Sequence, residues 1–235
     1  MWLFGFLCTS LGILIGGTIA WLFKGLQQKI DLVYGICAGI ILGLISIEIF
    51  PEAIELGGWL ITIVGFTVGM ILFGLLHNVL HYIQVFKKTS NIYIRSGLLL
   101  LISFAVHNLP MGITLGASQE KEFTISLLQT LLFHSIPEGI ILFTPLIMAG
   151  INVFLGFLIT LIISSPVLLG VFIGGVLGFN HQYFSAFLIS ITIGIILMVT
   201  VSEILYPALL KSSPLKIIAF TLIGFGIIGL YIKLF

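Results

Sequence analysis

The sequence predicts an all-α integral membrane protein with eight transmembrane helices, and two observations carry most of this prediction. Hydrophobic residues make up 60% of the 235 residues and charged residues only 7%, whereas a soluble domain carries about 25% charged residues. Long apolar segments also recur along the chain, and polar stretches separate most of them. With so few charges the protein could not cover its surface with solvated groups, so much of that surface must face lipid.

The apolar segments have the length that a bilayer requires, which is about 20 residues for a transmembrane helix. The first segment has no basic start and is long enough to cross the membrane, so we expect a helix rather than a cleaved signal peptide. All eight segments belong to one transmembrane domain that covers residues 1–235. The predicted spans are residues 2–23, 32–54, 58–80, 96–117, 125–148, 151–173, 183–205 and 215–234.

Polar stretches mark most of the boundaries between these spans. They are residues 24–29, 51–58, 81–95, 117–124 and 211–214. The turns near Gly150 and Gln182 are weaker signals. The 27 glycines suit close packing of helices in lipid.

The positive charges predict the orientation, because cytoplasmic loops carry an excess of Lys and Arg. With the N-terminus outside, Lys121 and Lys233 lie on the outer side and the other seven basic residues lie on the inner side. Those seven are Lys24, Lys29, Lys87, Lys88, Arg95, Lys211 and Lys216. We therefore expect both termini outside.

Several classes of function are disfavoured. Nucleic-acid binding is not expected, because the nine basic residues form no patch larger than a pair. An intramembrane zinc protease would need a His-Glu-x-x-His string, and neither that string nor a nucleophile elbow is present. We expect neither an enzyme nor a prosthetic group.

A repeated motif is the most informative feature. Residues 107–112 read His-Asn-Leu-Pro-Met-Gly and residues 134–139 read His-Ser-Ile-Pro-Glu-Gly. Both lie near the middle of consecutive spans, which must run antiparallel. Similar groups on antiparallel neighbours meet at mid-membrane, as expected of an inverted-repeat transporter.

The motif residues have the chemistry of a metal site. His134 and Glu138 are four residues apart and share one helix face, while His107 comes from the neighbouring helix. Imidazole nitrogen and carboxylate oxygen suit zinc and related divalent ions. Pro110 and Pro137 each remove one backbone hydrogen bond beside these groups.

Each of these residues also has a simpler interpretation. A single buried histidine is usually a structural hydrogen-bonding group, a single proline is usually a kink, and a buried glutamate can pair with a histidine for packing alone. The pairing of two such motifs favours metal ligation by His107, His134 and Glu138 together.

At these residues the chain resembles the ZIP (Zrt/Irt-like protein) family of divalent-metal transporters. The fourth helix of that family carries HNxPEG and the fifth carries HNxPEG or HDxPEG; this chain reads HNLPMG and HSIPEG. Residues 50–53 (Phe-Pro-Glu-Ala) are similar to the LPEA ending of the second helix, and residues 202–204 (Ser-Glu-Ile) are similar to the acidic end of the seventh.

The resemblance covers the whole chain and implies both architecture and function. It implies a 3+2+3 inverted-repeat arrangement of eight helices with both termini outside. It also implies a multi-pass protein of the cell membrane that carries divalent metal ions toward the cytoplasm, with zinc first and iron or manganese as alternatives. The expected partners are the metal substrate and the lipid bilayer, with a homodimer as an alternative to a monomer.

The resemblance further implies which residues bind the metal. His107, His134 and Glu138 would form the main site, Asn108 and Ser135 would fall on a second metal position, and Glu138 would bridge the two. The chain departs from the family at three positions. Met111 replaces the glutamate of the fourth helix, Ser165 stands where the sixth helix carries a glutamate, and Ser135 replaces an amide or carboxylate. With one certain carboxylate left, we expect a site for a single ion.

Two further hypotheses remain open. His77 and His81 are four residues apart at the inner end of the third span and could form a metal station on the exit side. The lost oxygen ligands also leave an alternative function, that of a membrane protein that binds metal without transporting it, as a sensor or a degenerate relative.

Overall fold

The computed structural model describes residues 2–22, 30–82, 91–118, 120–177 and 182–234, and every regular element within these residues is helical. The all-helical prediction is therefore confirmed for this part of the chain. In chain order the elements are α1 (Trp2–Leu22), α2 (Ile30–Leu44), η2 (Ile45–Ile49), α3 (Phe50–Tyr82), α5 (Ile92–Ala117), α6 (Lys121–Met148), α7 (Val153–Leu177), α8 (Gln182–Val199), η3 (Thr200–Leu205), α9 (Tyr206–Lys211) and α10 (Pro214–Leu234).

Seven helical segments of the described residues are long and apolar enough to cross a membrane. One of them, Asp31–Leu80, has 50 residues and would be about 75 Å long as a straight helix, far more than a bilayer is thick. The backbone leaves the helical conformation at Gly58, where φ is +73°, a value that glycine adopts without strain. The rings of Phe50 and Phe66 pack edge to face with centroids 6.3 Å apart, whereas a straight helix would separate them by about 24 Å. The segment therefore folds back on itself at Gly58.

The predicted break over residues 51–58 contains the observed reversal, which lies at its last residue. The helix continues through Pro51, Glu52 and Glu55 and reverses only at Gly58. Pro51 directly follows the π-helical turn η2 within this continuous helical run, and alanine and glutamate are good helix formers. Charged residues alone therefore did not end the helix.

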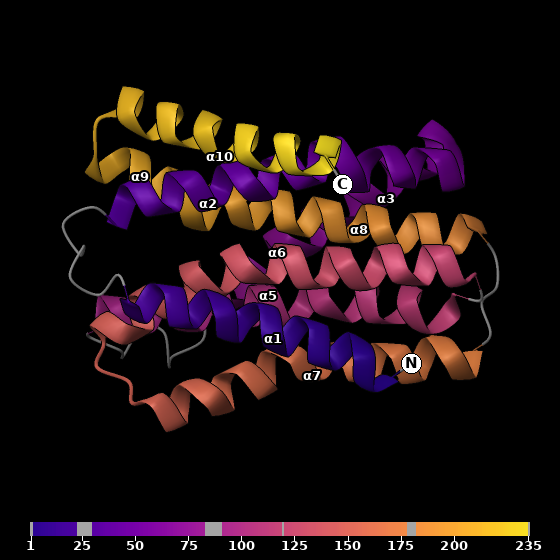
Figure 1. Ribbon diagram of the computed structural model, residues 1–235, viewed down its shortest axis with the longest axis horizontal. Coiled ribbons are helices and arrows are strands. Elements are labelled where there is room, and N and C mark those ends of the chain that lie inside the picture. The colour runs from indigo at the N-terminus through magenta and orange to yellow at the C-terminus, as the bar shows by residue number, and fades with distance from the viewer. Residues whose placement is uncertain (1, 23–29, 83–90, 119, 178–181, 235) are drawn as a thin grey trace.

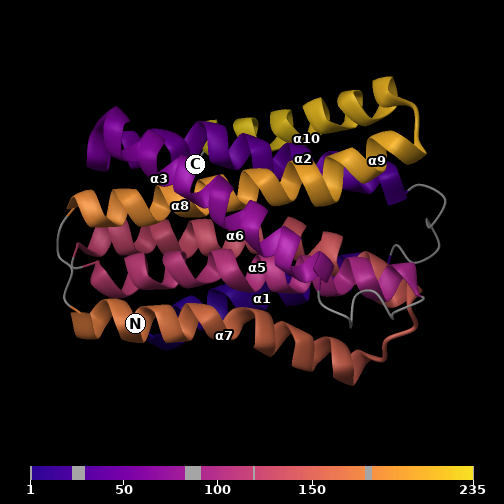
Figure 2. The same cartoon turned by 180° about the vertical axis from the view of Figure 1, so that it is seen from behind.

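The helices form two bundles that lie side by side (Figures 1 and 2). We call the first the site bundle; it contains α1, α5, α6 and α7, in which α1 packs on α6 and α5 packs on α7. We call the second the flanking bundle; it contains α2, α3, α8, α9 and α10, in which α3 packs on α8 and α2 packs on α10. Contacts of α5 with α8 and of α2 with α6 join the two bundles.

Two helices of the flanking bundle contain π-helical turns, and each turn carries an acidic residue. Segment η2 contains Glu48 and closes with the bond from Phe50 N–H to Ile45 O. Segment η3 contains Glu203 and closes with the bond from Tyr206 N–H to Val201 O. A π-turn adds one residue to an α-helix and is frequent at functional sites.

The two repeated motifs lie at the centre of the site bundle, and their glycines explain how it packs. A Cβ on Gly112 of α5 would lie 2.5 Å from the Val167 carbonyl oxygen of α7. A Cβ on Gly139 of α6 would lie 2.5 Å from the Ile13 carbonyl oxygen of α1. The last residue of each motif thus allows a neighbouring backbone to approach closely, as small residues do in membrane helices.

Candidate metal centre

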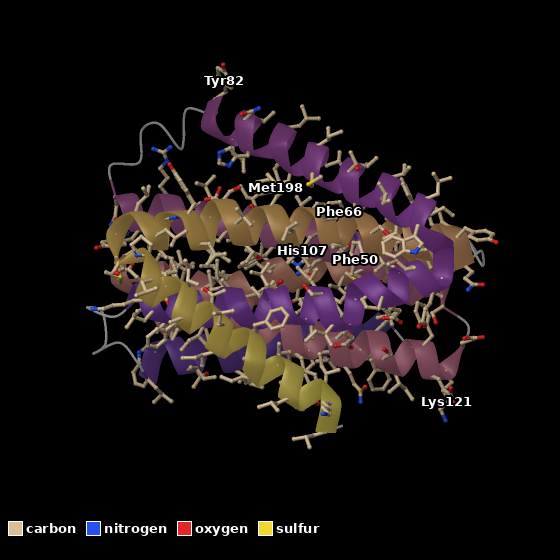
Figure 3. All side chains as sticks on the ribbon, turned by 90° about the horizontal axis from the view of Figure 1, so that it is seen from above. Phe50, Phe66, Tyr82, His107, Lys121 and Met198 are labelled. Carbon is tan, nitrogen blue, oxygen red and sulfur yellow. The ribbon has the colours of Figure 1, made fainter. Side chains whose placement is uncertain are left out.

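The three residues predicted as main ligands come together inside the protein. His107 lies on α5, and His134 and Glu138 lie one turn apart on α6; all three are at most 2% exposed. Figure 3 shows His107 about midway along the bundle, while Tyr82 and Lys121 lie toward opposite ends. Helices α5 and α6 stay helical through Pro110 and Pro137, so both motifs present their side chains from regular helix.

The donor atoms of this cluster are close enough to share one ion. One ligand atom from each of the three residues can be chosen so that all lie within 4.8 Å of one another. Glu138 Oε1 is 3.0 Å from His107 Nε2 and 4.0 Å from His134 Nε2. Ligand atoms around a tetrahedral zinc ion lie about 3.3 Å apart. The site therefore needs little rearrangement to accept an ion of this size.

Hydrogen bonds on the far side of both imidazoles fix their orientation. His107 Nδ1 contacts the carbonyl oxygen of Ser103 at 3.2 Å, and His134 Nδ1 contacts that of Thr130. A carbonyl oxygen can only accept, so Nδ1 carries the proton, and in the neutral imidazole Nε2 then keeps its lone pair. This is the tautomer that a metal ligand needs.

The atoms that face the centre lack hydrogen-bond partners. These atoms are His107 Nε2, His134 Nε2 and both carboxylate oxygens of Glu138. The 3.0 Å approach between His107 and Glu138 does not have hydrogen-bond geometry, so it does not satisfy either atom. Buried polar groups are normally paired, and unpaired ones call for an explanation. Three residues whose unpaired ligand atoms lie within 4.8 Å of one another, with one carboxylate among them, can bind a divalent cation.

Asn108 is fully buried next to His107 in the chain and contacts α7. Its side-chain Nδ2 donates to the carbonyl oxygen of Ile163 at 3.2 Å. Its Oδ1 and the hydroxyl of the buried Ser164 have no hydrogen-bond partner. Asn108 Oδ1 and the Ser164 hydroxyl are thus two neutral oxygens near the contact between α5 and α7. They contribute no negative charge that would balance a second metal ion.

The three positions at which the chain departs from the family motif make other contacts. Met111 is 1% exposed and packs in an apolar cluster. Ser135 donates to the Leu131 carbonyl oxygen and packs against α1 at Gly12. Ser165 is exposed and donates to the Ile162 carbonyl oxygen. Successive residues point about 100° apart on a helix, so the inward position on α7 belongs to Ser164 rather than Ser165.

The structure describes His77 of the predicted exit-side pair. His77 Nδ1 lies 3.0 Å from Glu203 Oε1, which joins α3 to η3. The side chain of His81 lies outside the described part of the structure. The metal station of His77 and His81 therefore stays a prediction.

Sequence reasoning missed one contact next to the metal cluster. The carbonyl oxygen of Thr130 accepts the hydrogen bond from His134 Nδ1. The hydroxyl of Thr130 donates a hydrogen bond to Glu48 Oε1 at 2.8 Å. Glu48 belongs to η2, so this bond links the two bundles. The available signal was a hydroxyl residue four positions before each motif histidine, at Ser103 and Thr130.

Comparison with known proteins agrees with this geometry. A family model described as "ZIP Zinc transporter" matches residues 84–231, more than half of the chain, including both motifs. A search of the curated proteins finds no match. With its apolar helices, its buried His107, His134 and Glu138 cluster and this match, the chain is a multi-pass membrane protein that belongs to the ZIP zinc transporter family.

Proposed function

We propose that this protein carries a divalent metal ion, zinc first, across the membrane toward the cytoplasm. The observation that carries the proposal is the buried cluster of His107, His134 and Glu138, whose Nε2 and carboxylate oxygen atoms have no hydrogen-bond partner. Two imidazoles and one carboxylate match the ligands of catalytic zinc sites, which keep a position open for water. Because an open position allows exchange, such a site suits a transported ion.

We propose that the site holds one ion at a time. Glu138 is the only carboxylate in the cluster. Asn108 contributes a neutral oxygen near α7, and Met111 is surrounded by apolar side chains. A second divalent ion would add two positive charges with no further carboxylate to balance them.

Uptake by the purified protein in liposomes tests the proposed transport. We expect zinc to accumulate inside the liposomes only when they contain the protein. The same assay with iron, manganese and cadmium compares the uptake of these metals with that of zinc. Tight zinc binding without uptake would instead support the alternative of a metal-binding protein that does not transport. Absence of both binding and uptake would exclude the proposed function.

We further propose eight spans in an inverted repeat, with both termini outside. The reversal at Gly58 supports two spans within Asp31–Leu80, and the labelled chain ends lie toward the same end of the bundle (Figure 1). Related features recur 155 positions apart and support the repeat. They are the close-packed Gly39 and Gly194, the π-helical starts at Ile45 and Thr200, and the acidic Glu48 and Glu203.

Cysteine labelling tests this orientation. In a background with Cys8→Ala and Cys37→Ala, Glu120→Cys should react with a membrane-impermeant thiol reagent added outside intact cells. Ser213→Cys should not react until the membrane is permeabilised. Both positions are exposed in the protein, so protection would report the membrane rather than burial. The opposite pattern would reverse the proposed topology.

A further inference from the structure

Glu48 and Glu203 occupy equivalent positions in the two proposed halves but make different contacts. Glu48 accepts from Thr130 of α6 at 2.8 Å, and this bond crosses from the flanking bundle to the site bundle. Glu203 pairs with His77 of α3 at 3.0 Å, and this contact stays within the flanking bundle. The symmetry of the chain is therefore broken at these two carboxylates.

The site bundle offers Glu203 a partner equivalent to Thr130. Ser103 precedes His107 by four residues, as Thr130 precedes His134, and both carbonyl oxygens receive the Nδ1 of their histidine. Both residues are 3% exposed and carry a hydroxyl. Since α5 and α6 run antiparallel, Ser103 and Thr130 lie on opposite sides of the metal cluster along the helix axes.

We propose that Glu48–Thr130 and Glu203–Ser103 are two alternative latches that close the metal site from opposite sides of the membrane. In this structure the Glu48–Thr130 latch is formed. It closes the metal site on the side of the membrane where α6 begins, which is the outer side in the proposed topology. In the opposite state Glu203 exchanges His77 for the hydroxyl of Ser103, and Glu48 releases Thr130. This inference rests on the proposed function of an inverted-repeat carrier.

The exchange conserves the number of these bonds between the two bundles. Each state contains one hydroxyl-to-carboxylate bond between the bundles, so one such bond replaces the other. The side chain of His77 is 33% exposed and can be hydrated when Glu203 leaves it. A carrier needs two states of similar energy that a small bias can interconvert.

Cysteine cross-linking tests both latches independently of transport. In the background with Cys8→Ala and Cys37→Ala, the pairs Glu48→Cys with Thr130→Cys and Glu203→Cys with Ser103→Cys are oxidised in liposomes with chelator present. We expect both pairs to form a disulfide, although only the first pair is in contact in this structure. The matched control pair, Glu48→Cys with Ser103→Cys, lies on opposite sides of the site and should not cross-link.

A transport assay then connects the latches to function. Each disulfide should stop uptake, and reduction should restore it. Failure of either pair to cross-link in a monodisperse protein would overturn the proposal, as would normal uptake by cross-linked protein. If cross-linking succeeds but no variant and no native protein transports metal, the latches stand and the proposed function fails.

Single substitutions provide a test that does not depend on whether the double-cysteine variants fold. Thr130→Val and Ser103→Ala each remove one hydroxyl donor, and both should lower the maximal uptake rate. Thr130→Ser and Ser103→Thr keep a hydroxyl and should retain uptake. Uptake by Ser103→Ala at the native rate would overturn the second latch, because the substitution removes the hydroxyl that this latch requires.

Discussion

The Glu138→Gln variant is expected to lose metal uptake almost completely while keeping its fold. The substitution preserves side-chain size but removes the only carboxylate of the cluster, which lies 3.0 Å from His107 Nε2. Loss of a mere hydrogen-bonding partner of a metal ligand costs roughly 10–100-fold in affinity or activity. Loss of the ligand itself should exceed that range, so we expect uptake in liposomes to fall by more than about a hundredfold.

The stability of the same variant separates a lost ligand from a misfolded protein. In the presence of a chelator, Glu138→Gln should unfold at the same or a higher temperature than the native protein, because a buried charge without a cation is unfavourable. Added zinc should then stabilise the native protein but not the variant. Glu120→Gln, at an exposed position outside the cluster, is the matched control and should behave as native. Native uptake by a well-folded Glu138→Gln protein would exclude Glu138 from the site.

The sequence predicted those parts of the fold and site that depend on local periodicity. Long apolar segments predicted the helices, since lipid requires backbone groups to be paired within each segment. The spacing of His134 and Glu138 predicted a shared helix face, and the two motifs predicted that His107 would join them. In each case the argument used only the rise and turn of one helix, or the antiparallel packing of two consecutive helices.

Features that depend on packing between distant segments could not be predicted in this way. To predict the Glu48–Thr130 bond one would need to know how far along the bundle η2 lies relative to α6. No local sequence pattern determines this relative position. The family resemblance placed Ser165 where the sixth helix carries a glutamate, whereas the rotation of α7 buries Ser164 and leaves Ser165 exposed. The break over residues 51–58 was predicted, but the residue at which the chain reverses, Gly58, is fixed by its positive φ, which the sequence does not show.

The Met111→Glu variant is expected to bind two metal ions where the native protein binds one. Met111 follows His107 by four residues, as Glu138 follows His134, so a glutamate there would share the helix face of His107. Two divalent ions about 4 Å apart repel by about 4 kcal/mol even at the dielectric constant of water. A second carboxylate next to the cluster would offset much of this repulsion, which in the native protein faces Glu138 alone.

The apolar surroundings of Met111 determine how this variant should behave without metal. The side chain packs with Leu115, Leu131 and Val167, so an ionised glutamate there would be buried without a partner and would destabilise the protein in chelator. Zinc should restore the lost stability, since an ion that binds only the folded state at a hundred times its Kd adds about 2.7 kcal/mol. Zinc should therefore raise the melting temperature of the variant by more than it raises that of the native protein.

Met111→Gln is the matched control for this experiment. It has the length and shape of the glutamate and should also be destabilised in chelator, but it adds no charge and should still bind one ion. Metal content per purified protein and anomalous scattering at the zinc edge both count the ions directly. Two fully occupied peaks beside Glu138 in the native protein would show that neutral groups such as Asn108 Oδ1 suffice for a second ion. A single ion in Met111→Glu would show that the α5 position does not reach the cluster.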